Sequence, residues 1–433
     1  MKRSIEIDAA RGFMLAWMTL THLPTVLTPY VNQPFGYVGS SEGFIFLSAL
    51  FTGRIYLRLL DRSGPGAMTR KLLGRTSKLY AYHIALLLGA FMFAGYYAVG
   101  GRIQSFHNLL DFYFAAGPGR AIRDALLLGY RPPLLDIIPL YILFLLFSPL
   151  LILLSLRIGW KPILAGSFAL WLAAQFGLRQ VIYSFMVAHL GLRIPLNEMG
   201  AFNLWAWQLV WVSGIWIGAR WARETLPAKA WARRMWIPAA IVAVAILARR
   251  YAEMGGLPLR HYQFLFDKWN LGVVRLVDLV ALGTVLIRFQ SAMTPFAIRP
   301  IVEMGQSSLR VFCAHFACCF VGIGMMGSAT RLYGWRQIPL VVGTFLVLWS
   351  IAKLSARKEL AIQEDRAATE PAAQVSITQV ARSWSVRTNA KHRTGGPLYQ
   401  WRREELPAVQ WNHPSLFRKE PPRPIGARSQ EGI

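Results

Sequence analysis

The sequence has few of the residues that build disulfide frameworks or zinc sites. It contains 3 cysteines and 8 histidines among 433 residues. Cys313, Cys318 and Cys319 all lie in one apolar stretch, and no second group of ligands at metal-binding spacing accompanies them. No disulfide framework or zinc site is therefore predicted, and we expect no metal. The three thiols are expected to be small buried side chains.

Acidic residues are also scarce, with 21 Asp and Glu against 47 Lys and Arg, which gives a formal net charge of +26. Such a charge is common in nucleic-acid-binding proteins. Here the basic residues are scattered between apolar stretches and form no recognition domain. We therefore expect no nucleic-acid partner and attribute much of the charge to membrane topology.

Apolar residues dominate, at 55% of the chain. They form recurrent stretches of roughly 17 to 25 residues, long enough to cross about 30 Å of hydrocarbon as helices. The sequence thus predicts an all-α, polytopic transmembrane helix bundle of about ten spans, occupying residues 1–355. The expected spans are 11–30, 42–60, 79–99, 136–156, 162–178, 200–219, 235–248, 271–288, 307–327 and 336–354.

Charge in the loops predicts the orientation. The loop Arg54–Lys78 holds seven basic residues against the single acid Asp61, which places it in the cytoplasm. The chain shows no small-residue cleavage pattern near its start, so the first span is expected to stay. With ten spans, both termini are expected to be cytoplasmic. Residues 356–433 are rich in Pro, Gln, Arg, Glu and Ser, and predict a disordered basic cytoplasmic tail. It could touch anionic membrane lipids, and a solvated tail without function is an equal alternative.

The first span carries three ionisable residues: Asp8, Arg11 and His22. At about 100° per residue, Arg11 and His22 differ by about 20°, and Asp8 lies within about 60° of Arg11. All three share one helix face. An arginine at the cytoplasmic edge would put His22, about 16 Å further along, near the middle of the bilayer. Ionisable groups at that depth are usually functional, although a structural helix–helix hydrogen bond is the alternative.

A second histidine, His315, lies about eight residues inside the ninth span and should reach a similar depth. Two such histidines could bind a metal, relay protons or act as acid–base catalysts, and the sequence leaves these alternatives open. Packing is an equal alternative for His315.

Further polar residues lie within apolar surroundings and would be unfavourable facing lipid. One polar cavity would explain them together. The alternatives are a structural ion pair between Arg275 and Asp136, and helix-linking roles for Asn203 and Gln208. The set consists of Glu42, Asp136, Asn203, Gln208 and Arg275.

These residues carry a family resemblance. Asp8-x-x-Arg11-Gly12, with a histidine eleven positions after the arginine, resembles the first helix of the acyltransferase-3 membrane enzymes. Within that group the chain is similar to the OpgC family over residues 3–330. The similar segments are SEGFIFLSALFTGRIY, RTSKLYAYH, LLDIIPLYILFLLFSPLLILL, FNLWAWQLVWVSGIWIG, DKWNLGVVRLVDLVAL and GQSSLRVFCAH.

Three positions depart from the pattern. Ser48-Ala49 stands where family members usually have Ser-Gly, and Asn203-Leu204 stands where they often have Asn-Pro. Arg75-x-x-Lys78 replaces the Arg-x-x-Arg of the wider superfamily, which keeps the charge and loses the second bidentate fork. These changes bear on the substrate more than on the fold.

The resemblance implies an acyltransferase of the bacterial inner membrane that moves a succinyl group from succinyl-CoA to the hydroxyls of periplasmic glucans. A basic rim of Arg70, Lys71, Arg75 and Lys78 would dock the CoA phosphates. We hypothesise that His22 is the general base, that Asp8 and Arg11 shape the entrance, and that His315 orients the acceptor or shares the proton transfer. The remaining polar residues would bind substrate.

Two alternatives remain. The same chemistry could act on another envelope glycan or lipid. A proton-coupled transporter or flippase could instead use the histidines as a proton relay.

Overall fold

The computed structural model describes residues 5–99, 109–223, 227–256, 262–291, 297–326 and 331–357. All of these lie in one compact unit, Met1–Glu364, and the described residues contain helices and no β-strand. Five helical stretches among them are long and apolar enough to cross a membrane: Ser40–Tyr96, Ile137–Ile158, Lys229–Met254, Ser308–Met326 and Gly334–Arg357. The protein is a polytopic helical membrane protein, as predicted. Nearly all of the predicted tail, from residue 358 onward, lies outside the described residues.

The first helix, α1, covers Ile5–His22 and therefore ends earlier than the predicted span of 11–30. Pro24 explains this end, because the residue before a proline disfavours the helical conformation. The chain after it is anchored elsewhere: the amide of Leu332 donates to the carbonyl of Pro24 at 2.9 Å. The short helix α2, Thr28–Val31, follows. His22 is thus the last residue of a helix instead of lying inside one.

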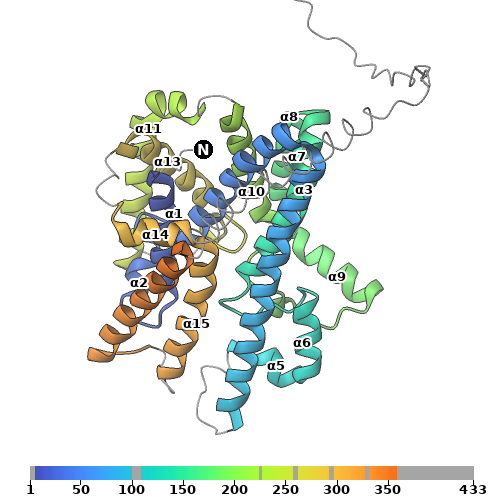
Figure 1. Ribbon diagram of the computed structural model, residues 1–433, viewed down its shortest axis with the longest axis vertical. Coiled ribbons are helices and arrows are strands. Elements are labelled where there is room, and N and C mark those ends of the chain that lie inside the picture. The colour runs from blue at the N-terminus through green and yellow to red at the C-terminus, as the bar shows by residue number, and fades with distance from the viewer. Residues whose placement is uncertain are drawn as a thin grey trace, which may run out of the picture. The chain divides into compact units, whose positions relative to one another are not determined.

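The second and third predicted spans form one 60-residue element, α3, Ser40–Val99. It consists of two helical arms that meet at Gly64, where φ is 79°. Glycine followed by Pro65 suits this break, since the left-handed region is open to glycine and proline can begin a new helix. The predicted cytoplasmic loop Arg54–Lys78 is therefore helical except at Gly64, which corrects the sequence-based boundary. Figure 1 shows the long second arm running away from the break.

Most of the other predicted spans coincide with a helix to within a few residues, but only five stretches of the described residues have the length and apolarity of a membrane crossing, so the predicted count of ten is not confirmed. The seventh is longer than predicted, and α9, which was not predicted, follows α8 directly. Two of the expected spans, α8 and α13, have 16 residues, fewer than the roughly 20 that a perpendicular crossing needs. The helices are α5 (Asp111–Ala116), α6 (Pro118–Leu126), α7 (Ile137–Ile158), α8 (Trp160–Gln175), α9 (Leu178–Leu190), α10 (Leu204–Arg223), α11 (Pro227–Met254), α12 (Gln263–Phe266), α13 (Val273–Arg288), α14 (Arg299–Gln306) and α15 (Ser308–Met326).

Glycines allow the first arm of α3 and α10 to pack at close range. A Cβ on Gly218 would lie 1.9 Å from the carbonyl oxygen of Leu50, and one on Gly53 would lie 2.2 Å from that of Ile215. Gly214, four residues before Gly218, faces Ala49 in the same way. Small residues four apart on both helices are typical of close packing in membranes. The two helices run parallel, and Arg223 pairs with Asp61 at their far end at 2.8 Å.

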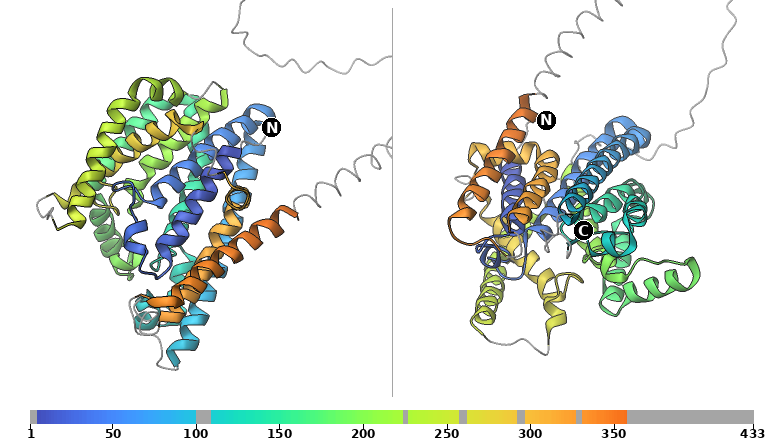
Figure 2. Two further views of the ribbon diagram at one scale, coloured as in Figure 1. Left: turned by 90° about the vertical axis from the view of Figure 1, so that its left-hand side faces the viewer. Right: turned by 90° about the horizontal axis from the view of Figure 1, so that it is seen from below.

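A second close crossing holds α1 against α14. A Cβ on Gly12 would lie 1.8 Å from the carbonyl oxygen of Ile301, and one on Gly305 would lie 1.8 Å from that of Asp8. The glycine of the Asp-x-x-Arg-Gly motif is thus required by packing. The helix at 337–357 lies beside α14 and α15 (Figure 2), where Trp349 Nε1 donates to Glu303 at 2.7 Å.

These contacts predict that Gly53→Ala will lower stability, because the new methyl group would collide with the backbone of α10. Overpacking of this kind costs about 1–3 kcal/mol. Gly74→Ala, in the same element with nothing within 4 Å of its Cβ position, should be neutral or slightly stabilising, since alanine favours helix. Thermal unfolding of the purified variants in one detergent checks this. Equal transition temperatures for the two variants would contradict the close crossing.

Candidate functional site

Polar residues gather where several helices end or begin. His22 ends α1, Glu42 lies in the first turn of α3, and Asp136 immediately precedes α7. Asn203 precedes α10, and Arg275 lies in the first turn of α13. We call this set of five residues the polar end. Helix termini carry unsatisfied backbone groups, which makes such a place suitable for polar side chains.

The two histidines lie side by side. Nδ1 of His22 is 3.1 Å from Nε2 of His315, and the rings are stacked with centroids 5.4 Å apart. His315 is buried, whereas His22 is half-buried. Phe316 packs against both rings. The structure thus brings together two histidines 293 residues apart in sequence.

The hydrogen bonds assign a proton to each ring. Nδ1 of His315 contacts the carbonyl oxygen of Phe312, and a carbonyl only accepts, so this Nδ1 carries a proton. In a neutral imidazole the other nitrogen then accepts, so His22 donates from Nδ1 to Nε2 of His315. Nε2 of His22 is left with a lone pair. This arrangement suits a general base whose ring is oriented by a second histidine.

Arg11 and Asp8 lie further along α1. The Arg11 guanidinium bonds the hydroxyl of Ser308 and lies 5.6 Å from the centre of the Phe51 ring. Asp8 is buried against α14. Because Phe51 is near the middle of the first arm of α3, Arg11 lies near the middle of that helix instead of at its edge. The histidine pair lies near the start of α3, since Phe312 stacks on Phe44 at 4.9 Å.

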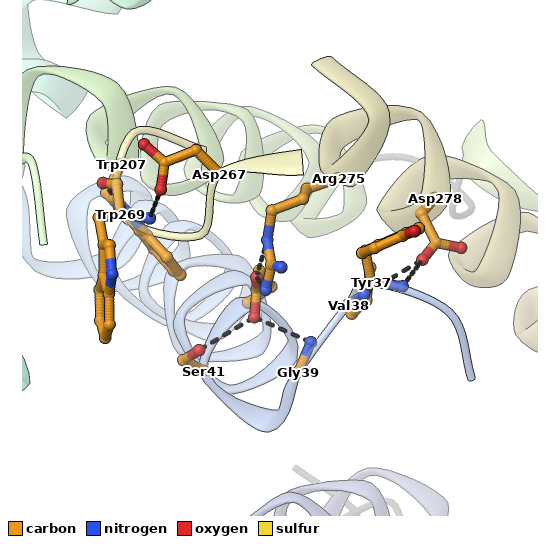
Figure 3. Close-up of polar contacts among 10 residues, drawn as sticks. Tyr37, Val38, Gly39, Ser41, Trp207, Asp267, Trp269, Arg275 and Asp278 are labelled. Atoms are coloured by element: carbon orange, nitrogen blue, oxygen red, sulfur yellow. Dashed lines mark hydrogen bonds and ion pairs between the residues drawn. The ribbon is translucent and has the colours of Figure 1, made fainter. Parts of the chain in front are cut away.

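Glu42 and Arg275 form a fully buried ion pair. Nε and Nη2 of Arg275 donate to one oxygen of Glu42 at 2.9 and 2.6 Å. The other oxygen accepts from the Gly39 amide at 3.0 Å and the Ser41 hydroxyl at 2.9 Å (Figure 3). The pair ties α3 to α13. The structure thus contradicts the suggested pairing of Arg275 with Asp136, because the Arg275 guanidinium pairs with Glu42 instead.

Asp278, one turn after Arg275, extends this network. Its Oδ2 accepts from the amides of Tyr37 and Val38 at 2.7 and 3.1 Å, as Figure 3 shows. This residue was missed from sequence, although an acid inside the apolar span 271–288 was a usable signal. It holds the chain that leads into α3 against α13.

Asn203 and Trp207 position the loop 267–272. The Asn203 amide side chain donates to Oδ1 of Asn270 at 2.8 Å, and its backbone amide donates to the carbonyl of Trp269 at 3.0 Å. Trp207 Nε1 donates to the same carbonyl at 3.1 Å. The loop is therefore bound to the start of α10, and Asp267 caps it internally by accepting from the amide of Trp269 at 2.8 Å.

Gln208 and Asp136 make structural contacts. Gln208 accepts from the Ser167 hydroxyl at 2.6 Å and donates to the Ser167 carbonyl at 2.7 Å, which links α10 to α8. Asp136 accepts from the Ala201 amide at 3.0 Å. Arg179 holds the same segment by donating to the Gly200 carbonyl at 2.6 Å. For Gln208 the geometry agrees with the helix-linking alternative.

Arg75 differs from the other members of the basic rim. It is half-buried and donates to the hydroxyl of Tyr141 on α7 at 2.6 Å. Lys78 is exposed, as are Arg70 and Lys71. The predicted rim is therefore divided between three exposed cations and one that reaches inward. Tyr141 packs on Phe44, with ring centroids 6.2 Å apart, which places an aromatic series between Arg75 and the histidine pair.

Lys268 was missed from sequence, although it lies in the quoted segment DKWNLGVVRLVDLVAL. Its positive charge acts on His22, Glu42 and Asp136, which belong to three separate parts of the polar end. Burial lowers the pKa of the Lys268 ammonium, and the Glu42 carboxylate opposes this effect. The residue stands in the loop that Asn203 and Trp207 fix.

Among the described residues, no group of three or more His, Cys, Asp or Glu side chains has a metal-binding arrangement. Comparison with protein families gave a match between residues 3–359 and the model described as OpgC protein. Comparisons with curated proteins and with solved structures gave no match.

The buried pair predicts a test of stability. Glu42→Gln removes one charge and leaves Arg275 uncompensated, which should cost about 3–5 kcal/mol. The double variant Glu42→Gln, Arg275→Gln removes both charges and should recover part of that loss. Unfolding of Glu42→Gln, Arg275→Gln and the double variant in detergent measures the difference. A double variant as unstable as the sum of the two single variants would show that the pair is not coupled.

Proposed function

We propose, from the premise that this chain belongs to the OpgC family, that it transfers a succinyl group from succinyl-CoA to sugar hydroxyls of periplasmic glucans. The family supports a membrane acyltransferase that modifies glucans. The observation that carries the mechanism is the contact of His22 with His315 at 3.1 Å. It provides one imidazole nitrogen free to accept a proton and a second histidine to hold that ring.

The proposed reaction is a single acyl transfer. Nε2 of His22 removes the proton of a sugar hydroxyl as its oxygen attacks the thioester carbonyl. A carbon–oxygen bond forms, the carbon–sulfur bond breaks, and the CoA thiolate takes up the proton that His22 received. His315 stabilises the charged His22 by accepting from Nδ1, as the second member of a catalytic pair does in other hydrolases and transferases.

The donor would approach from the basic rim. CoA phosphates favour the exposed cations Arg70, Lys71 and Lys78. The pantetheine arm would then pass Arg75 and the aromatic rings of Tyr141, Phe44 and Phe312, whose contacts lead to His315. In this proposal the sugar enters at the polar end. Donor and acceptor thus meet from opposite sides of the membrane at the histidine pair.

We predict that His22→Ala abolishes transfer, since a general base contributes roughly 10²–10⁴-fold to the rate. The assay uses purified protein in proteoliposomes, acyl-labelled succinyl-CoA and glucan, and counts label bound covalently to the glycan. Parental rates in a folded, abundant variant would refute the assignment. Glucan that crosses the membrane without gaining label would favour the transporter, and label on a lipid would favour another acceptor.

The role of His315 can be separated from that of His22. His315→Gln keeps an oxygen that can accept from Nδ1 of His22, whereas His315→Ala keeps none. We expect His315→Ala to lower kcat by roughly 10²-fold or more, by analogy with loss of an orienting partner, and His315→Gln to restore part of it. KM for both substrates should change little. Equal kcat values in the two variants would show that His315 does not orient His22.

A further inference from the structure

Lys268 is a half-buried cation in a loop that is held on several sides. Besides the bonds from Asn203 and Trp207, Gln175 donates to the carbonyl of Asn270 at 2.7 Å. Trp171 donates to the carbonyl of Leu271 at 3.0 Å. Three side chains from α8 and α10, together with the backbone amide of Asn203, thus fix the backbone on the carboxyl side of Lys268. A side chain carried by such a loop is well placed for recognition, because little conformational freedom is lost when a ligand binds.

The carboxylates around Lys268 already have other partners. Glu42 binds Arg275 and the Gly39 amide. Asp136 accepts from the Ala201 amide, and Asp267 from the Trp269 amide and the Asn270 side chain. Among the described residues, no carboxylate forms an ion pair with the Lys268 ammonium.

The Lys268 ammonium lies 5.2 Å from the centre of the Trp269 ring, and a half-buried ammonium without an ion-paired carboxylate is an unfavourable arrangement in a protein. Its loop leads into α13, whose Arg275 binds Glu42 at the start of α3. Two residues further on, Phe44 stacks on Phe312, which packs against His315. A succinyl thioester carries its free carboxylate three carbon–carbon bonds from the reacting carbonyl, about 4 Å when extended. A carboxylate at that distance from the thioester carbon is the ligand that a lysine at the polar end would attract.

We propose that Lys268 binds the free carboxylate of a dicarboxylic acyl group and so selects succinyl-CoA over uncharged acyl-CoA donors. This inference rests on the proposed acyl transfer and adds the residue that determines donor specificity. Lys268 makes an ion pair with the acyl chain while His22 acts on the acceptor. It takes no part in bond formation, and its contribution is to hold the thioester carbonyl in place beside the histidine pair.

The test compares succinyl-CoA with butyryl-CoA, which has the same chain length and a methyl group in place of the carboxylate. Both donors are assayed with glucan in proteoliposomes, using the parental protein, Lys268→Gln and Lys268→Arg. We expect Lys268→Gln to lower kcat/KM for succinyl-CoA by roughly 10- to 100-fold, the contribution of a charged hydrogen bond, mainly through KM. Transfer from butyryl-CoA should change by less than about 3-fold, and Lys268→Arg should retain the preference. Lys161→Gln, an exposed lysine on α8, is the matched control and should behave as the parent.

The outcomes distinguish the two proposals. Transfer from neither donor by the parental protein would overturn the proposed function itself. Active parental protein with no preference for succinyl-CoA would overturn only the role of Lys268. An equal loss of transfer from both donors in Lys268→Gln would assign Lys268 a structural role and would also overturn the inference. A thermal transition of Lys268→Gln that matches the parent shows that the variant is folded.

Discussion

The buried pair of Glu42 and Arg275 is the interaction on which the polar end depends. Two charges in the interior of a membrane protein are tolerated only when they face each other and have further hydrogen bonds. Here Arg275 brings the start of α13 to the start of α3, and Glu42 also fixes the turn at Gly39. The loop before α13 is consequently brought to the start of α10, where Asn203 binds it. Lys268 stands in that loop.

The histidine pair depends on a different constraint, the close packing of α1. Gly12 and Gly305 let α1 touch α14, and α15 follows α14 after a single residue. His22 and His315 are therefore held on neighbouring helices at one level. The Phe312 carbonyl then determines which nitrogen of each ring carries the proton. Backbone packing in this way sets the chemistry of a side chain some distance away.

Much of this architecture follows from sequence. Apolar length gave the helical membrane fold, and the ionisable residues of span one pointed to His22. His22 and His315 lie at one level, as predicted. That level is near the start of α3, whereas Arg11 lies near the middle of the first arm, so the predicted depths of His22 and Arg11 are corrected. Other features depend on pairing between distant segments, which no periodicity encodes. The partner of Arg275 is one such feature. The end of α1 before Pro24 is hard to predict for another reason, because apolar residues continue beyond the proline. No sequence pattern distinguishes Lys268, because loop residues carry no burial periodicity.

Arg75 differs from the other basic residues of the rim for the same reason, since its partner lies on a helix distant in sequence. A charge-rich stretch in sequence predicts a solvated surface, yet Arg75 turns inward because Tyr141 on α7 offers a hydroxyl at 2.6 Å. Helix α3 must continue past Gly64 for that contact to exist. The predicted loop boundary and the predicted uniform rim are therefore corrected together by one structural fact.

The most direct test of the central claim is mass spectrometry of periplasmic glucans from cells that contain this protein and from otherwise identical cells that lack it. Acyl transfer to glucan predicts a series of heavier species, each separated by the mass of one succinyl substituent, only when the protein is present. Identical glucan masses in the two strains, with the protein shown to be in the membrane, would contradict the account.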